Sequence, residues 1–174
     1  MIFVTVGTQL PFDRLIKAVD QWAARNNRSD VFAQIGPENA YRPRHIQWAH
    51  FVAAPECRRW VERADLVVSH AGMGTIISAL ELGKPLIVMP RRCDLHEHRN
   101  DHQSATVARL GARASVKVAL DSDSLEKSLD ELANLKTTQP ITRSASPQLL
   151  HAIRRFINNP GVELPAGERV LATE

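Results

Sequence analysis

Short apolar runs alternate with amphipathic segments along the first 135 residues. The run at 2–6 is apolar apart from one threonine, a pattern typical of a strand buried on both faces of a sheet. Between 11 and 25, apolar residues recur at the 3.6-residue period of a helix. The same patterns predict strands at 2–6, 31–35, 66–70, 85–89 and 114–118, one or two short strands within 45–52, and helices at 11–25, 56–63, 75–82, 101–110, 122–135 and 147–158.

The alternation of buried strands and helices predicts an α/β fold, a Rossmann-like parallel sheet with helices on both of its faces. Composition changes after Lys136, where Thr, Ser, Gln and Pro become frequent. We therefore expect one domain at 1–136, followed at 137–174 by a helix and a tail that pack on this domain or on a partner. The residues at 159–174 include two prolines and two glycines and are expected to be loose.

Composition restricts the class of protein further. Of the 174 residues, 44% are hydrophobic and 24% charged, which excludes a disordered or fibrous chain. The formal net charge of +3 is too small to indicate a nucleic-acid partner. Two cysteines do not make a disulfide framework and suit a reducing cytoplasm. No apolar stretch of about 18 residues occurs. We therefore expect a cytoplasmic chain whose membrane association requires a partner or a surface patch.

Three polar segments follow predicted strands, at 7–9, 70–75 and 91–103. Because ligands of parallel sheets bind at the carboxyl ends of the strands, we expect these segments to share one site. Gly72 and Gly74 allow a tight turn, and the N–H groups that open the next helix favour an anion such as a diphosphate. The alternative is that the glycines only tighten the turn. The spacing is neither a P-loop nor G-x-G-x-x-G, which argues against an ordinary ATPase or NAD enzyme.

The segment 91–103 gathers three of the seven histidines and many other polar side chains. Such a set is either a solvated loop or a ligand site. Asp101, His102 and Gln103 begin a predicted helix, and a carboxylate beside an amide suits vicinal sugar hydroxyls. His98 and His102 stand four residues apart and offer a zinc site as the rival interpretation. The H-E-x-x-H order is absent, and we expect no metal.

Four motifs carry a resemblance to a known family. They are VTVGTQLPFDRLI at 4–16, SHAGMGT at 69–75, GKPLIVMP at 83–90 and HQ at 102–103. In this order they resemble the glycosyltransferase family 28 C-terminal domain in its short, free-standing form, over about residues 2–135. The chain resembles the small subunits of two-part glycosyltransferases, one of which extends a dolichol-linked oligosaccharide. Its run EHRNDHQ is particularly similar to bacterial exopolysaccharide glycosyltransferase subunits.

The resemblance implies a GT-B enzyme divided between two chains. This chain would be the nucleotide-sugar half, equivalent to the C-terminal half of a GT-B glycosyltransferase, and a membrane-anchored partner would supply the acceptor half. Together they would transfer a hexose from a UDP-sugar to a lipid-linked acceptor in exopolysaccharide or oligosaccharide synthesis, at the inner face of the membrane. No cofactor and no obligatory metal are expected. The alternative is a non-catalytic subunit that binds a nucleotide-sugar or serves as a scaffold.

The resemblance and the polar segments together suggest the site residues. The donor sugar would contact Asp101, His102 and Gln103, and the candidates for acid–base catalysis are Glu97 and His98. The nucleotide would be bound by Gly7, Thr8, Phe51, Val52, His70, Gly72, Met73, Gly74 and Thr75.

His70 has three candidate roles, and Ser78 and Thr106 depart from the family pattern. His70 either hydrogen-bonds phosphate, acts as a base or packs against its neighbours. Ser78 stands where many members of the family carry a glutamate that grips the ribose hydroxyls, and Glu81 lies one turn further along the predicted helix. Thr106 replaces a frequent asparagine. The ribose contact is therefore the part of the pattern from which this chain departs.

Overall fold

The computed structural model describes residues 1–38, 40–100, 103, 106–108, 115–131, 140–141 and 144–158. The chain forms two compact units, Met1–Ile141 and Thr142–Glu174. The predicted domain boundary at 136 lies outside the described residues and stays a prediction. The first unit contains every residue assigned to the predicted site.

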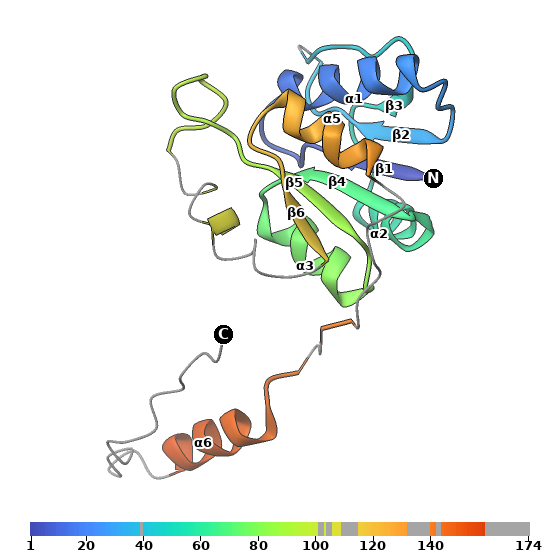
Figure 1. Cartoon of the computed structure of the whole chain (residues 1–174). Helices are drawn as coiled ribbons and strands as arrows, with labels where there is room; N and C mark the ends of the chain where they lie inside the picture. Colours follow the sequence, from blue (N-terminus) through green and yellow to red (C-terminus); the bar gives the residue numbers. More distant parts are fainter. Residues whose placement is uncertain are drawn as a thin grey trace. The chain divides into compact units, whose positions relative to one another are not determined.

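A six-stranded sheet forms the centre of the first unit (Figure 1). Its order is β3-β2-β1-β4-β5-β6, and every neighbouring pair is parallel. This order is the Rossmann arrangement, in which the chain leaves the centre in one direction and then returns to continue in the other. The strands are β1 (Ile2–Thr5), β2 (Val31–Gln34), β3 (Gln47–Ala49), β4 (Leu66–His70), β5 (Leu86–Met89) and β6 (Val116–Val118).

Helices cover both faces of the sheet, with α1 and α5 on one side and α2 and α3 on the other (Figure 1). Successive residues of β1 enter different cores: Phe3 belongs to the cluster under α2 and α3, and Val4 to the cluster under α1 and α5. This double burial explains the continuous apolar run and confirms the predicted α/β architecture. The helices are α1 (Asp13–Arg25), α2 (Ala54–Arg63), α3 (Met73–Glu81) and α5 (Ser122–Asp130).

Element boundaries differ from the predictions in informative ways. Helix α2 begins at Ala54, before the predicted start at 56, because Pro55 is tolerated in a first helical turn. Strand β1 ends at Thr5, since the chain turns towards Gly7, whose φ is +76°. Of the predicted helix at 101–110, the described residues are Gln103 and 106–108, and these are helical. Asp101 and His102 lie outside the described residues.

The second unit contains helix α6 (Pro147–Asn158), which matches the predicted bounds. Its sequence is amphipathic, and its large apolar side chains are exposed. The tail predicted to be loose lies outside the described residues. Nowhere in the described ranges does a helix combine the length and apolar character needed to cross a membrane.

Asp20 is the buried acid of helix α1, at 1% exposure. Its carboxylate accepts hydrogen bonds from the Tyr41 hydroxyl at 2.9 Å and from the backbone N–H of Arg44 and His45, the latter at 2.8 Å. It therefore holds the segment before β3 against the helix.

We expect Asp20→Ala to lower the free energy of unfolding by about 3 kcal/mol, because three donors lose a charged acceptor in a buried place. Urea unfolding measures the change. Asp123→Ala, which removes an exposed aspartate from the first turn of α5, serves as the matched control and should change stability by less than about 1 kcal/mol. Equal effects of the two substitutions would contradict the assignment.

Candidate active site

The cavity of the first unit lies where the strand order reverses, between the loops that follow β1 and β4. Ligands of Rossmann-like sheets bind at this position. The cavity has a volume of about 700 Å³. Its lining residues are Thr5, Val6, Gly7, Thr8, Gln9, Leu10, Gln34, Val52, Ala54, Cys57, Arg58, Val61, His70, Gly72, Gly74, Thr75, Ser78, Arg91, His98 and Gln103.

The described ionisable side chains that line the cavity are mainly basic. Among the described residues, the cavity is lined by two arginines and two histidines and by no aspartate or glutamate. A cavity with basic and hydroxyl groups and no carboxylate favours an anionic ligand. The predicted gathering of three polar segments at one edge is therefore observed: residues from 7–9, 70–75 and 91–103 all line it.

The start of helix α3 opens into this cavity. Its N-cap is Gly72, whose backbone is extended and which offers no side-chain cap to the helix. The first backbone hydrogen bond of the turn runs from the N–H of Ile76 to the carbonyl of Gly72, at 3.2 Å. The N–H groups of residues 73–75 precede that bond. A Cβ atom added at Gly74 would meet nothing within 4 Å, so an anion has room to approach these amides.

The imidazole of His70 fills the space between two glycines. A Cβ atom at Gly72 would lie 2.1 Å from its Nε2, and one at Gly7 would lie 2.7 Å from its Cε1. Gly7 also has a φ of +76°, which other residues rarely adopt. Both glycines are therefore required by the ring that separates the loops after β1 and β4.

His70 is held in its neutral form. Burial lowers its pKa to about 4, and the positive charges of Arg91 and His98 act in the same direction, while the backbone carbonyl of Thr5 opposes them. Its Nδ1 is buried and has no hydrogen-bond partner among the described residues. A neutral imidazole at this edge can donate a hydrogen bond to an anion without carrying charge itself.

Gln34 joins the loops on the other side of the cavity. Its Nε2 donates to the carbonyl of Gly7 at 2.9 Å, and its Oε1 accepts from the N–H of Val52 at 3.1 Å. The Gly7 N–H donates in turn to the Thr5 hydroxyl at 3.1 Å. Gln34 was not among the predicted site residues, although a glutamine near the end of an apolar strand was the available signal.

Glu97 and His98 are neighbours in sequence, but only His98 lines the cavity. Both Glu97 carboxylate oxygens accept hydrogen bonds from Arg14, each at 2.8 Å, and one also accepts from the backbone N–H of Arg92 at 2.9 Å. Glu97 does not line the cavity, and the ion pair anchors the loop after β5 to helix α1. His98 does line the cavity. A catalytic function of either residue stays a prediction.

The remaining predicted residues divide into two groups. Phe51 and Met73 are exposed at 49% and 50% and do not line the cavity, although each adjoins a residue that does. Gln103 lines it, is 4% exposed and accepts the N–H of Arg91 at 3.0 Å through its Oε1. The zinc alternative depends on His102, outside the described residues.

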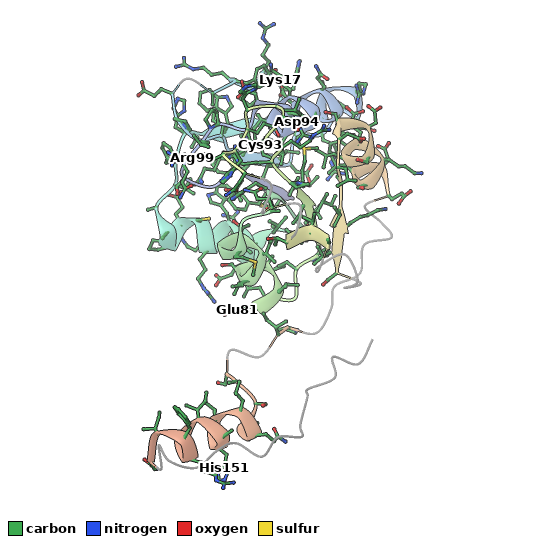
Figure 2. The ribbon with its side chains drawn as sticks, turned by 90° about the vertical axis from the view of Figure 1, so that its left-hand side faces the viewer. Lys17, Glu81, Cys93, Asp94, Arg99 and His151 are labelled. Atoms are coloured by element: carbon green, nitrogen blue, oxygen red, sulfur yellow. The ribbon has the colours of Figure 1, made fainter. Side chains whose placement is uncertain are left out.

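Ser78 and Glu81, the two residues considered for a ribose contact, lie differently with respect to the cavity. Ser78 lines the cavity, and its hydroxyl donates to the carbonyl of Gly74 at 2.9 Å. Glu81 lies at the last turn of α3, away from the loop that carries Cys93 and Arg99 (Figure 2). Its carboxylate is 4.0 Å from Arg58, and it does not line the cavity. Glu81 therefore lies outside the cavity that Ser78 lines. A ribose contact by either residue stays a prediction.

Comparison with known proteins agrees with this geometry. The model of the glycosyltransferase family 28 C-terminal domain matches residues 1–157. A relative from Yarrowia lipolytica, UDP-N-acetylglucosamine transferase subunit ALG13, is 27% identical over 137 residues, which are 72% of this chain and 67% of the relative. A solution structure of ALG13 matches with a TM-score of 0.57 at 19% identity, over 87% of this chain and 93% of that chain. MurG from Acinetobacter baumannii matches with a TM-score of 0.57 at 20% identity, over 76% of this chain and 41% of that chain.

The topology, the position of the cavity and the structural matches define a Rossmann-like domain equivalent to one half of a GT-B glycosyltransferase, as predicted. The family match covers most of the chain. The chain belongs to the glycosyltransferase family 28 C-terminal domain family.

The buried state of His70 predicts a pH dependence of stability. Its pKa is about 4 in the folded chain and near the ordinary 6.5 in the unfolded chain. Between these values the unfolded chain binds a proton that the folded chain does not bind. Stability is therefore full above pH 6.5 and falls towards pH 4, by on the order of 3 kcal/mol from this group.

Urea unfolding at pH 7.5 and pH 5 should show a smaller loss of stability in His70→Gln than in the wild type. His45→Gln, which changes an exposed histidine before β3, is the matched control and should keep the wild-type pH dependence. The same pH dependence in His70→Gln and wild type would refute the assignment.

Proposed function

We propose that this chain is the UDP-sugar-binding subunit of a two-part glycosyltransferase. The observation that carries the proposal is the start of helix α3, whose first amides open into a cavity that no described aspartate or glutamate lines. A diphosphate fits these amides and the glycine turn, as helix N-termini in related folds accept phosphates. The Yarrowia lipolytica relative, named as a UDP-N-acetylglucosamine transferase subunit, supports a UDP-sugar as the ligand.

In this proposal the chain's own groups stabilise the leaving diphosphate. An acceptor hydroxyl attacks the anomeric carbon, the bond from that carbon to the diphosphate oxygen breaks, and the hydroxyl proton passes to a base. The α3 amides and the neutral imidazole of His70 stabilise the negative charge on the departing UDP. His98 is the candidate base on this chain because it lines the cavity, and Arg14 and Glu97 fix the loop that carries it.

A partner chain supplies the acceptor half. Four large apolar side chains follow the carboxyl ends of strands around the cavity and are 39% to 50% exposed: Leu10, Phe51, Met73 and Leu95. Exposed apolar side chains gathered at one edge are typical of an interaction surface. The proposed partner is a membrane-anchored glycosyltransferase subunit that holds a lipid-linked acceptor, so that this chain acts at the inner face of the membrane.

The identity of the product is a finer proposal. The named relatives are UDP-N-acetylglucosamine transferase subunits, which favours N-acetylglucosamine as the transferred sugar. The resemblance of the run at 97–103 to exopolysaccharide enzymes keeps exopolysaccharide synthesis as a prediction beside oligosaccharide synthesis. The non-catalytic alternative predicts that turnover in the assembled complex is indifferent to changes in this cavity.

Gly74→Asp tests the diphosphate site. Because the added carboxylate occupies the open space before the α3 amides, we expect UDP affinity to fall at least about 100-fold in calorimetry. Stability should not fall, since an acidic residue in the first turn of a helix is favourable by about 0.3–1 kcal/mol.

Two control variants separate the effect of a charge at this position from the effects of an added side chain and of a charge elsewhere on α3. Gly74→Ala adds a Cβ that meets no neighbour, and Ile77→Asp adds the same charge to an exposed α3 position that does not line the cavity. Both should fold, and Ile77→Asp should retain most of the UDP affinity. Undiminished UDP binding by folded Gly74→Asp would refute the assigned site.

Gln103→Ala separates a catalytic subunit from a scaffold. The substitution removes the acceptor of the Arg91 N–H and a side chain that lines the cavity. In the complex with the acceptor subunit, we expect sugar transfer to fall at least about tenfold, while assembly measured by gel filtration is unchanged. Full turnover by an intact complex that contains this variant would favour the scaffold.

A further inference from the structure

Arg91, two residues after the end of β5, is a buried arginine in the lining of the cavity. It is 2% exposed. Its Nη1 donates to the carbonyls of Pro11 at 2.5 Å and of Glu97 at 3.2 Å. Its Nη2 donates to the carbonyls of Val6 at 3.0 Å and of Leu10 at 2.7 Å. One guanidinium therefore satisfies four backbone carbonyls.

These carbonyls belong to two loops that the sequence separates by some eighty residues. Three lie in the loop after β1, which carries Gly7, and one lies in the loop after β5, which carries His98. The guanidinium also stacks over the ring of Phe12, with 4.7 Å from Cζ to the ring centroid. A planar fork of donors makes such a set of contacts, whereas an ammonium group does not.

The charge of Arg91 lacks an acidic partner among the described residues. The carboxylate of Glu97 pairs with Arg14 and offers Arg91 only its backbone carbonyl. Burial lowers the pKa of Arg91 to about 10, while the negative charge of Glu97 acts to raise it, so the side chain is charged at pH 7. A buried charge without a counterion is unfavourable. An anion in the cavity would balance it.

We propose that Arg91 is the positioning residue of this site: it holds the loops after β1 and β5 in the arrangement that receives a diphosphate, and the diphosphate balances its buried charge. The inference rests on the proposed UDP-sugar function and assigns that function a residue which none of the sequence motifs singled out. A purely structural clamp would support both loops equally well without any dependence on the charge of the ligand.

Calorimetry with UDP and with uridine tests the proposal on the wild type, Arg91→Lys and Arg91→Met. Lysine keeps the charge but not the fork, and methionine keeps neither. We expect UDP affinity to fall about tenfold in Arg91→Lys and about 100-fold in Arg91→Met, with uridine affinity changed less than about twofold in both. Equal losses for UDP and uridine would show a purely structural clamp and contradict the proposal.

The pKa of the His70 imidazole provides an independent measure of the charge at position 91. The charged groups that lower its pKa are Arg91 and His98, and the backbone of Thr5 acts in the opposite direction. In an NMR titration, the pKa of His70 should rise above about 4 in Arg91→Met and stay unchanged in Arg91→Lys. Arg92→Met is the matched control, because Arg92 pairs with Asp94 at the surface and does not line the cavity. It should leave both UDP affinity and this pKa at the wild-type values.

The outcomes separate this proposal from the proposed function. A wild-type chain that does not bind UDP contradicts both. A wild-type chain that binds UDP, together with folded Arg91 variants that bind it equally well, contradicts only the proposal for Arg91. If neither variant folds, the wild-type Arg91 Nε–H resonance decides: it should shift on addition of UDP but not of uridine, and an absent shift overturns the proposal.

Discussion

The close approach of two loops around the ring of His70 is the constraint on which the site depends. Strands β1 and β4 are neighbours and run in the same direction, so the turns that follow them meet at one edge of the sheet. The imidazole fills the space between them and leaves no room for a side chain at Gly7 or Gly72. The chain therefore enters α3 with its first amides directed into the cavity and not covered by a capping side chain.

Electrostatics then distinguish this cavity from an ordinary gap between loops. The helix start contributes partial positive charge, Arg91 contributes a full charge, and no described carboxylate lines the cavity to cancel them. The acids nearest in sequence are used elsewhere: Glu97 pairs with Arg14, and Asp94 pairs with Arg92. In the part of the chain that the structure describes, these acidic side chains support the loops, and the side chains that line the site are positive or neutral.

The sequence predicted the features that depend on local pattern. Residues of β1 and β5 are buried on both faces and appear as continuous apolar runs, so the sheet and its ligand edge could be predicted. The site residues on glycine turns were predicted because a glycine pair directly before a helix can be recognised in the local sequence. Gln34 was not predicted, and Arg91 was predicted only as part of the polar segment 91–103, because their partners are backbone groups of loops distant in sequence.

The same distinction explains why the partner of Glu97 could not be predicted, whereas the position of Ser78 could. The run at 97–103 shows its polar character in the sequence, but the partner that engages Glu97 lies on α1, which sequence spacing does not reveal. The position of Ser78 was predictable because α3 fixes it one turn after Gly74. Local pattern therefore identifies the edge of the sheet where the candidate site lies, and tertiary contacts decide which side chains line it.

The most direct measurement is the amide NMR spectrum of the full chain during titration with UDP. The account predicts that the N–H resonances of residues 73–75 move first and furthest, together with those of Gly7 and Thr8, since a diphosphate hydrogen-bonds to them. Binding of UDP that leaves these amides unmoved and shifts resonances elsewhere on the domain would contradict it.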